Sequence, residues 1–229
     1  MNKHEVRGWI EETGIVAAVR VYSPEDALFA AEAVVAGGIP VVEIALTVPN
    51  AATVISQLVE HHSRAIIGAG GVRRVDTASR CLEAGAKFLT SDGLHRPVIE
   101  FAAQEELVAI PGALTPTEVM TAWEAKSDYV KVVPCADIGG DRYILSLHRM
   151  FPEIPLIASG GVNQQNATKF ILCGATALGI GRELLPAEAI RLRQSDRIGE
   201  LARRFLGFVK AGRDHLAARR TRQMAMDEA

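Results

Sequence analysis

The chain alternates short apolar runs with longer amphipathic segments, and this alternation repeats eight times along its 229 residues. The runs are rich in β-branched residues and recur roughly every 20 to 26 residues, the length of one strand plus one helix. Such alternation without long polar gaps indicates a parallel sheet covered by helices, and eight units indicate an α/β protein with a closed (β/α)8 TIM barrel. The expected strands cover residues 15–20, 41–46, 65–70, 87–91, 107–112, 129–134, 156–161 and 177–181.

The segments between the runs carry helix signals. Residues 51–58 place apolar side chains at the i, i+3, i+4 and i+7 positions of one helix face. Residues 23–26 and 115–118 each offer a capping hydroxyl, a proline at the first helical position and an acidic residue in the first turn. A doubly wound open sheet is the alternative fold, but it usually has five or six strands and a glycine-rich turn after the first. Residues 15–26 contain no glycine, which favours the barrel.

We expect a single barrel domain over residues 1–229, because no linker or low-complexity tract interrupts the alternation. Residues 1–13 are polar and helix-like and are expected to form an N-terminal helix. Residues 210–229 form a basic C-terminal extension, for which a solvated helix end or a frayed tail is favoured over a binding site. Its basic residues include Lys210, Arg213, Arg219, Arg220 and Arg222.

Charge and apolar content narrow the possible partners. The chain has 25 Lys and Arg against 27 Asp and Glu, so its net charge does not attract nucleic acid or an acidic membrane surface. The hydrophobic share of 48% excludes a disordered chain. No apolar run reaches the ~20 residues of a membrane helix, and the N-terminus lacks the apolar core of a signal peptide. We therefore expect a soluble, cytoplasmic protein that binds neither nucleic acid nor membrane.

The cysteines give no sign of a disulfide scaffold or a metal site. Cys81, Cys135 and Cys173 are odd in number and far apart, and no two of them have the spacing of a thiolate metal site. Reduced thiols and no bound metal are the expectation.

Two charged residues lie within strands that are otherwise apolar. Lys131 lies in the run 129–134 and Glu43 in the run 41–46, each between β-branched residues that indicate a strand buried on both faces. Burying an isolated charge costs several kcal/mol, so each side chain needs a partner or a chemical role.

For a lysine, that role is specific. Burial disfavours the charged ammonium, and a neutral amine attacks a ketone to form a Schiff base, whose iminium lets a neighbouring C–C bond break or form. The reaction needs an acid/base group, for which Glu43 is the candidate beside the nucleophile Lys131. The alternative is a buried Lys131–Glu43 ion pair without chemistry.

Glycines after the last two expected strands suggest a phosphate site. Gly160 and Gly161 follow the seventh strand, and Gly181 with Arg182 follows the eighth. The loops at these two positions are the usual phosphate site of the fold, because their backbone N–H groups point at an anion. Arg182 can add a charge-assisted contact. Glycines also serve tight turns, which is the alternative.

Other strand ends are candidates for substrate binding. Arg20 ends the first strand and Thr47 follows the second, where they can bind a carboxylate or a hydroxyl; for Arg20 a surface salt bridge is equally open. Gly71 after the third strand and Pro111 in the fifth allow close approach of a ligand, or serve as turns.

The chain resembles the bacterial 2-keto-3-deoxy-6-phosphogluconate (KDPG) and 4-hydroxy-2-oxoglutarate (KHG) aldolases, class I aldolases on a (β/α)8 barrel. The resemblance runs from about Ile15 to Pro186, and the segments that contain Lys131 and Glu43 are its specific parts. The matching segments are 18–20, 37–39, 43–49, 67–70, 110–112, 114–118, 131–134, 160–163 and 179–181.

The resemblance implies roles for these residues. Lys131 matches the Schiff-base lysine, Glu43 the general acid/base, and Gly160, Gly161 and Gly181 the glycines that bind substrate phosphate. It implies cleavage of KDPG to pyruvate and glyceraldehyde 3-phosphate, or of 4-hydroxy-2-oxoglutarate to pyruvate and glyoxylate. It also implies a homotrimer that needs neither a metal nor an organic cofactor.

The departures from the family concern the substrate more than the reaction. Thr47 stands where many members have an arginine, and Ala45 and Gly71 replace threonines. Asp92 replaces the proline of a Ser-Pro-Gly turn. A changed set of hydrogen-bond donors can shift selectivity by orders of magnitude. Further departures are Val133 for a phenylalanine, residues 158–159 for Pro-Thr, and Arg182 for a serine at the phosphate site.

Two other functions remain open on these residues. A phosphate-binding barrel isomerase or epimerase could use Glu43 for proton transfer without a Schiff base. A barrel that has lost catalysis could bind a phosphorylated metabolite or a partner, in keeping with the missing threonines and phenylalanine.

Overall fold

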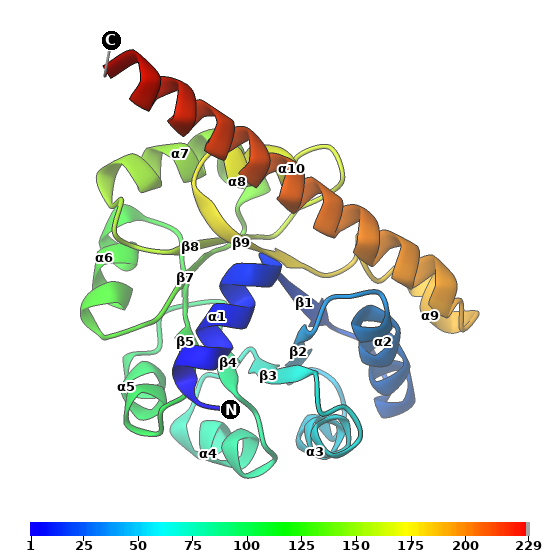
Figure 1. The fold of residues 1–229 in the computed structure, drawn as a ribbon. Helices are drawn as coiled ribbons and strands as arrows, with labels where there is room; N and C mark the ends of the chain where they lie inside the picture. The colour runs from blue at the N-terminus through cyan, green and yellow to red at the C-terminus, as the bar shows by residue number, and fades with distance from the viewer. Residues whose placement is uncertain (228–229) are drawn as a thin grey trace.

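The computed structural model describes residues 1–227, and Figure 1 looks into a barrel along its axis. All strand pairs are parallel, in the order β5-β4-β3-β2-β1-β9-β8-β7-β6. The predicted barrel is confirmed, and each predicted run contains one strand of its wall. The strands are β1 (Ile15–Val19), β2 (Val41–Ala45), β3 (Ile66–Gly70), β4 (Phe88–Thr90), β5 (Val108–Ile110), β6 (Gly112–Ala113), β7 (Val130–Val132), β8 (Leu156–Ser159) and β9 (Ala175–Ile180).

The barrel closes through β5 and β6, two short strands that are neighbours in sequence. They belong to one barrel strand that Pro111 interrupts, because proline has no backbone N–H to donate. β5 pairs with β4 and β6 pairs with β7. At the interruption, the backbone N–H of Lys131 donates to the Pro111 carbonyl at 2.8 Å. Residues 108–113 therefore connect β4 on one side with β7 on the other and close the barrel wall.

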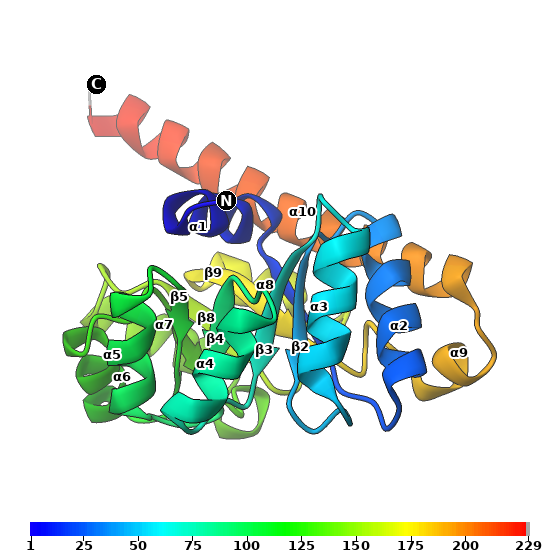
Figure 2. The same ribbon diagram turned by 90° about the horizontal axis from the view of Figure 1, so that it is seen from below.

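Helices cover the outside of the barrel between successive strands (Figure 1, Figure 2). The two predicted helix starts are confirmed: Ser23 Oγ accepts a hydrogen bond from Asp26 N at 3.1 Å, and Thr115 forms a capping box with Glu118. The helices are α1 (Lys3–Thr13), α2 (Pro24–Ala36), α3 (Ala51–His61), α4 (Val75–Glu83), α5 (Arg96–Gln104), α6 (Pro116–Glu124), α7 (Asp141–Met150), α8 (Ala167–Leu172), α9 (Ala187–Arg191) and α10 (Ser195–Asp227), with a short 3-10 helix η1 at Ala136–Ile138.

The predicted N-terminal helix, α1, lies across one opening of the barrel, as Figure 1 and Figure 2 show. Its Val6 and Ile10 are buried against apolar side chains near the starts of the strands, which fill the barrel interior at this end. The side chains in this inner cluster with them are Val16, Val41, Ile66, Phe88, Val108, Ile110, Tyr129, Ile157 and Ala177.

Inward-facing side chains change from apolar to polar along the strands. Every second residue of a strand points inward. On β4 and its continuation these residues are Phe88, Thr90 and Asp92, and on β7 and the residue before it they are Tyr129 and Lys131. The apolar members lie toward α1, so the polar groups gather at the opposite opening, formed by the C-terminal ends of the strands.

The basic C-terminal extension is the second half of a single helix, α10, of 33 residues. Its first part packs along α2 and α8, and its end runs past the barrel body in Figure 1. The extension is thus helical to Asp227 rather than frayed, while residues 228–229 and the side chain of Arg220 lie outside the described part. No helix within residues 1–227 is long and apolar enough to cross a membrane.

Arg213 anchors α10 to the end of α1. Its guanidinium donates to the carbonyls of Glu11 and Glu12, which belong to the last turn of α1 and have no partner within that helix. A third bond goes to the Thr176 carbonyl at 3.4 Å. Gly14, in the left-handed region at φ +66°, ends α1 directly beneath this guanidinium, where a Cβ would collide with it.

We expect Arg213→Ala to lower the free energy of unfolding by about 2 kcal/mol, because the change removes charged donors from otherwise unpaired carbonyls. Chemical denaturation followed by circular dichroism measures this. Arg219→Ala, at an exposed position of the same helix, is the matched control and should change the value by less than about 0.5 kcal/mol. Equal effects of the two substitutions would show that Arg213 does not hold α10 to α1.

Candidate active site

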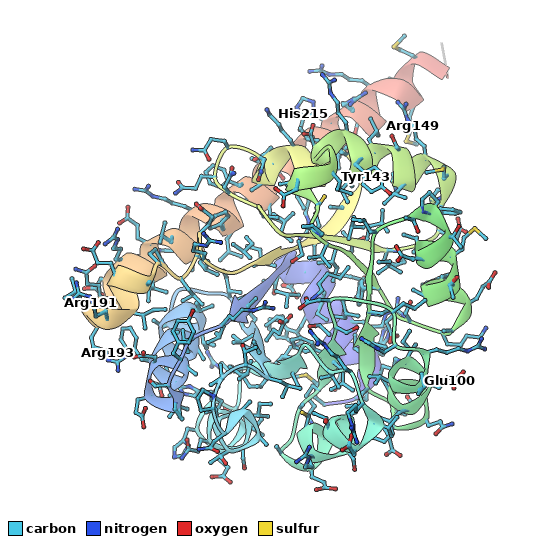
Figure 3. All side chains as sticks on the ribbon, turned by 180° about the vertical axis from the view of Figure 1, so that it is seen from behind. Glu100, Tyr143, Arg149, Arg191, Arg193 and His215 are labelled. Carbon is cyan, nitrogen blue, oxygen red and sulfur yellow. The ribbon has the colours of Figure 1, made fainter. Side chains whose placement is uncertain are left out.

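A cavity of about 1190 Å³ opens at the C-terminal ends of the strands, opposite α1. Figure 3 views the molecule from this side, with Arg191 of the cavity rim labelled on α9. Most of the residues predicted to form the site line this one cavity, although they come from distant parts of the sequence. They are Arg20, Glu43, Thr47, Lys131, Gly160, Gly161, Gly181 and Arg182.

Two predicted substrate-binding residues lie elsewhere. Gly71 and Pro111 are absent from the cavity lining. Gly71 takes a positive φ of +77° where the chain leaves β3, and Pro111 forms the interruption between β5 and β6. Both therefore have a role in the path of the backbone, and the geometry gives no support to a substrate contact.

Lys131 is held rigidly at the centre of the site. Its backbone lies in β7, paired with Gly112 on one side and Ile157 on the other. The side chain is buried, and its Nζ donates a hydrogen bond of 2.9 Å to Asp92 Oδ1. The amine thus reaches the cavity from an apolar wall with a carboxylate beside it.

Asp92 joins two basic side chains at the cavity. Besides the bond to Lys131, its Oδ2 lies 3.6 Å from Arg20 Nη2. Burial raises the pKa of Asp92, and the Lys131 ammonium lowers it through its charge and hydrogen bond. The guanidinium charges of Arg20 and Arg73 lower it further, so the net pKa of Asp92 lies below the ordinary value for aspartate.

Glu43 lies within the barrel on β2. Only 3% of Glu43 is exposed, and its Oε2 accepts a hydrogen bond of 2.8 Å from Thr90 Oγ1. Gly70 of β3 makes room for the carboxylate, since a Cβ there would collide with Glu43 Oε1. The carboxylate is therefore fixed by both a donor and a close backbone approach.

The ion pair between Lys131 and Glu43 that the sequence left open does not form. The described structure pairs Lys131 with Asp92 and Glu43 with Thr90. Thr90 was not among the predicted site residues, and Asp92 was noted only as a departure from the family, because their strand is short and Asp92 lies two residues beyond its end. The available signal was register: Asp92 is two residues beyond Thr90 and so faces inward at the level of the strand ends.

The glycines predicted to bind phosphate form turns at the cavity edge. Gly160 and Gly161 both have positive φ, at +82° and +79°. A Cβ on Gly161 would collide with Ala136, so this turn packs closely against η1. Asn166, another residue that the sequence did not single out, donates through Nδ2 to the Gly161 carbonyl at 2.9 Å and holds the turn.

The backbone at these turns has free donors. In the described chain, the N–H groups of Gly160, Gly161 and Arg182 donate to no other residue. The Arg182 side chain is exposed at the end of β9 and belongs to the cavity lining. Unpaired backbone donors beside a guanidinium suit an anion.

The described residues offer neither a reactive cysteine at Cys135 nor a cluster of metal ligands. Cys135 is buried, and burial raises the pKa of its thiol to about 12, so it is not a nucleophile near neutral pH. No three His, Cys, Asp or Glu side chains within residues 1–227 are grouped so that they could hold a metal ion.

A parallel barrel with a buried lysine and a buried glutamate at the C-terminal ends of its strands is typical of an enzyme, because active sites of this fold lie at that opening. The family model of the KDPG and KHG aldolases matches residues 6–201, and the chain belongs to this family of lyases.

Known relatives agree with this assignment. The chain is 29% identical over 208 residues to the 2-dehydro-3-deoxy-6-phosphogalactonate aldolase of Escherichia coli K12, covering 90% of this chain and 98% of the relative. It is 30% identical over 189 residues to the KHG/KDPG aldolase of the same strain, covering 82% and 89%. A solved KDPG aldolase from Legionella pneumophila, with pyruvate captured as a covalent carbinolamine, superimposes with a TM-score of 0.79 at 28% identity, covering 85% of this chain and 95% of that one.

Proposed function

We propose that the protein is a class I aldolase that cleaves or forms a C–C bond of a phosphorylated 2-keto-3-deoxy sugar acid through a Schiff base on Lys131. The observation that carries the proposal is the Lys131 amine, 5% exposed in the barrel wall and aimed into the same cavity as Glu43. The carbinolamine captured in the Legionella relative supports it, because that adduct precedes a Schiff base.

The proposed substrate is KDPG, which yields pyruvate and glyceraldehyde 3-phosphate. The phosphogalactonate aldolase among the relatives makes the galactonate form of the same sugar acid a second substrate to assay. Both compounds carry a phosphate, which suits the free N–H groups and Arg182 at the cavity edge. These groups favour a phosphorylated acid over 4-hydroxy-2-oxoglutarate, which has a second carboxylate instead.

The reaction uses the two buried residues in turn. The Lys131 amine adds to the C2 ketone, and loss of water leaves an iminium that withdraws electrons. Glu43 accepts the proton of the C4 hydroxyl, the C3–C4 bond breaks, and its electron pair moves into the iminium to give an enamine and the aldehyde. Protonation of the enamine at C3 and hydrolysis of the iminium then release pyruvate and the free lysine.

Lys131→Ala should reduce the rate of KDPG cleavage at least about 1000-fold, because no other lysine of the described residues lines the cavity to form the iminium. Pyruvate release, coupled to lactate dehydrogenase, measures the rate. Lys87→Ala, which changes a lysine just before β4 at the α1 end of the barrel, is the control and should retain activity. Unchanged KDPG cleavage by Lys131→Ala would overturn the Schiff-base mechanism. An isomerase or epimerase would instead show a turnover that borohydride does not affect and that Glu43→Gln abolishes.

Arg182→Ser should raise KM for KDPG about tenfold, because it removes one charge-assisted contact to the phosphate. The same substitution should leave KM for unphosphorylated 4-hydroxy-2-oxoglutarate unchanged, which makes that substrate the internal control. Steady-state kinetics on both substrates measure the difference. Equal changes in the two KM values would place Arg182 outside the phosphate site.

A further inference from the structure

The carboxylate in contact with the reactive amine is Asp92, not Glu43. Asp92 Oδ1 accepts a hydrogen bond of 2.9 Å from Lys131 Nζ. Within the described chain, neither a hydrogen bond nor an ion pair joins Glu43 to Lys131, and the Glu43 carboxylate is bonded to Thr90 instead. The group best placed to exchange protons with the amine is therefore a residue at which the chain departs from its family's usual proline.

The backbone holds Asp92 in this position. The chain passes Gly112 of β6 so closely that a Cβ there would collide with the Asp92 carbonyl carbon and the Gly93 nitrogen. Asp92 and Thr90 lie on the same inward face of β4 and its continuation, one above the other. The Thr90–Glu43 contact therefore lies one layer deeper in the barrel than the Asp92–Lys131 contact.

Asp92 is also suited to move protons. Its side chain is 39% exposed, against 6% for Lys131, so it faces the cavity from which a substrate enters. The charged groups that act on it are the ammonium of Lys131 and the guanidinium groups of Arg20 and Arg73. These positive charges favour the ionised form of Asp92, and the loss of a proton from Lys131 removes one of them, so Asp92 becomes a stronger base as it accepts that proton.

We propose that Asp92 is a second acid/base residue of the reaction, which carries protons from the Lys131 nitrogen to the departing oxygen during Schiff-base formation. This inference rests on the proposed aldolase function, and it assigns to Asp92 a step for which the sequence alone suggested Glu43.

The proton count of the step defines what such a carrier must do. Lys131 begins as an ammonium with three N–H protons and ends as an iminium with one, while the ketone oxygen leaves as water with two. Two protons thus pass from nitrogen to oxygen. Asp92 accepts the first, the nitrogen lone pair then forms the N–C2 bond, and the C=O π pair moves to oxygen, which takes that proton from Asp92.

The second transfer repeats the first. Asp92 accepts another proton from the carbinolamine nitrogen and donates it to the C2 hydroxyl. The C–O bond then breaks, the nitrogen lone pair forms the C=N bond, and water departs. Asp92 ends as the carboxylate that it was at the start, and the net charge does not change.

In this proposal, Glu43 carries out the proton transfers of the later steps, at C3 and at the C4 hydroxyl. Its fixed position beside Thr90, one layer below, suits a single task at C3 and C4 rather than a role at both ends of the reaction. The two carboxylates then divide the proton transfers between iminium formation and C–C bond cleavage.

Isotope exchange into pyruvate separates the two tasks. Loss of ¹⁸O from pyruvate labelled at C2 reports iminium formation, and uptake of deuterium at C3 reports enamine formation. Both are measured by mass spectrometry on the full-length protein, and Lys131→Ala supplies the background. Asp92→Asn keeps the size and a hydrogen-bond acceptor but cannot carry protons, and Asp92→Glu keeps the carboxylate.

We expect Asp92→Asn to slow ¹⁸O loss about 100-fold, the usual size of an acid/base contribution, and Asp92→Glu to recover most of it. Glu43→Gln should keep ¹⁸O loss while deuterium uptake falls. An Asp92→Asn rate within threefold of the wild type, or above it, would overturn the inference and leave Asp92 as a static partner of Lys131. A wild-type rate equal to that of Lys131→Ala would overturn the Schiff-base function itself.

Discussion

The rest of the site depends on the buried ammonium of Lys131, which needs a negative partner at the strand ends. A lysine in a barrel wall, 5% exposed, costs several kcal/mol unless a negative group accompanies it. Asp92 meets this requirement at 2.9 Å, and Arg20 on the far side of the same carboxylate completes a chain of alternating charges at the cavity mouth. Such an arrangement contributes little to stability compared with an apolar wall, so its presence at the cavity points to chemistry.

The two openings of the barrel have different roles: one is packed and the other holds the cavity. Apolar side chains and α1 fill one opening. The opposite opening is lined by polar side chains, which lie on the same inward faces of the same strands. A shift of one residue in register would turn Lys131 and Glu43 out of the cavity, so the packing at one end positions the chemistry at the other.

Much of this could be predicted from the sequence, because strand spacing and apolar runs directly encode a barrel. The predicted runs agree with the observed strands to within about two residues, and Lys131 and Glu43 were recognised because a charge interrupts a β-branched run. The pairing of Lys131 with Asp92 was not predictable in this way, since it depends on how β4 and β7 are placed across the barrel. For the same reason Gly71 and Pro111, predicted from glycine and proline alone, lie outside the cavity lining.

In the proposed reaction, Lys131 forms the covalent intermediate. Incubation of the protein with pyruvate and borohydride, followed by mass spectrometry of the intact protein and its peptides, tests this most directly. We predict one reduced pyruvyl adduct per chain, located on Lys131. An adduct on another lysine, or none on folded protein, would contradict the account.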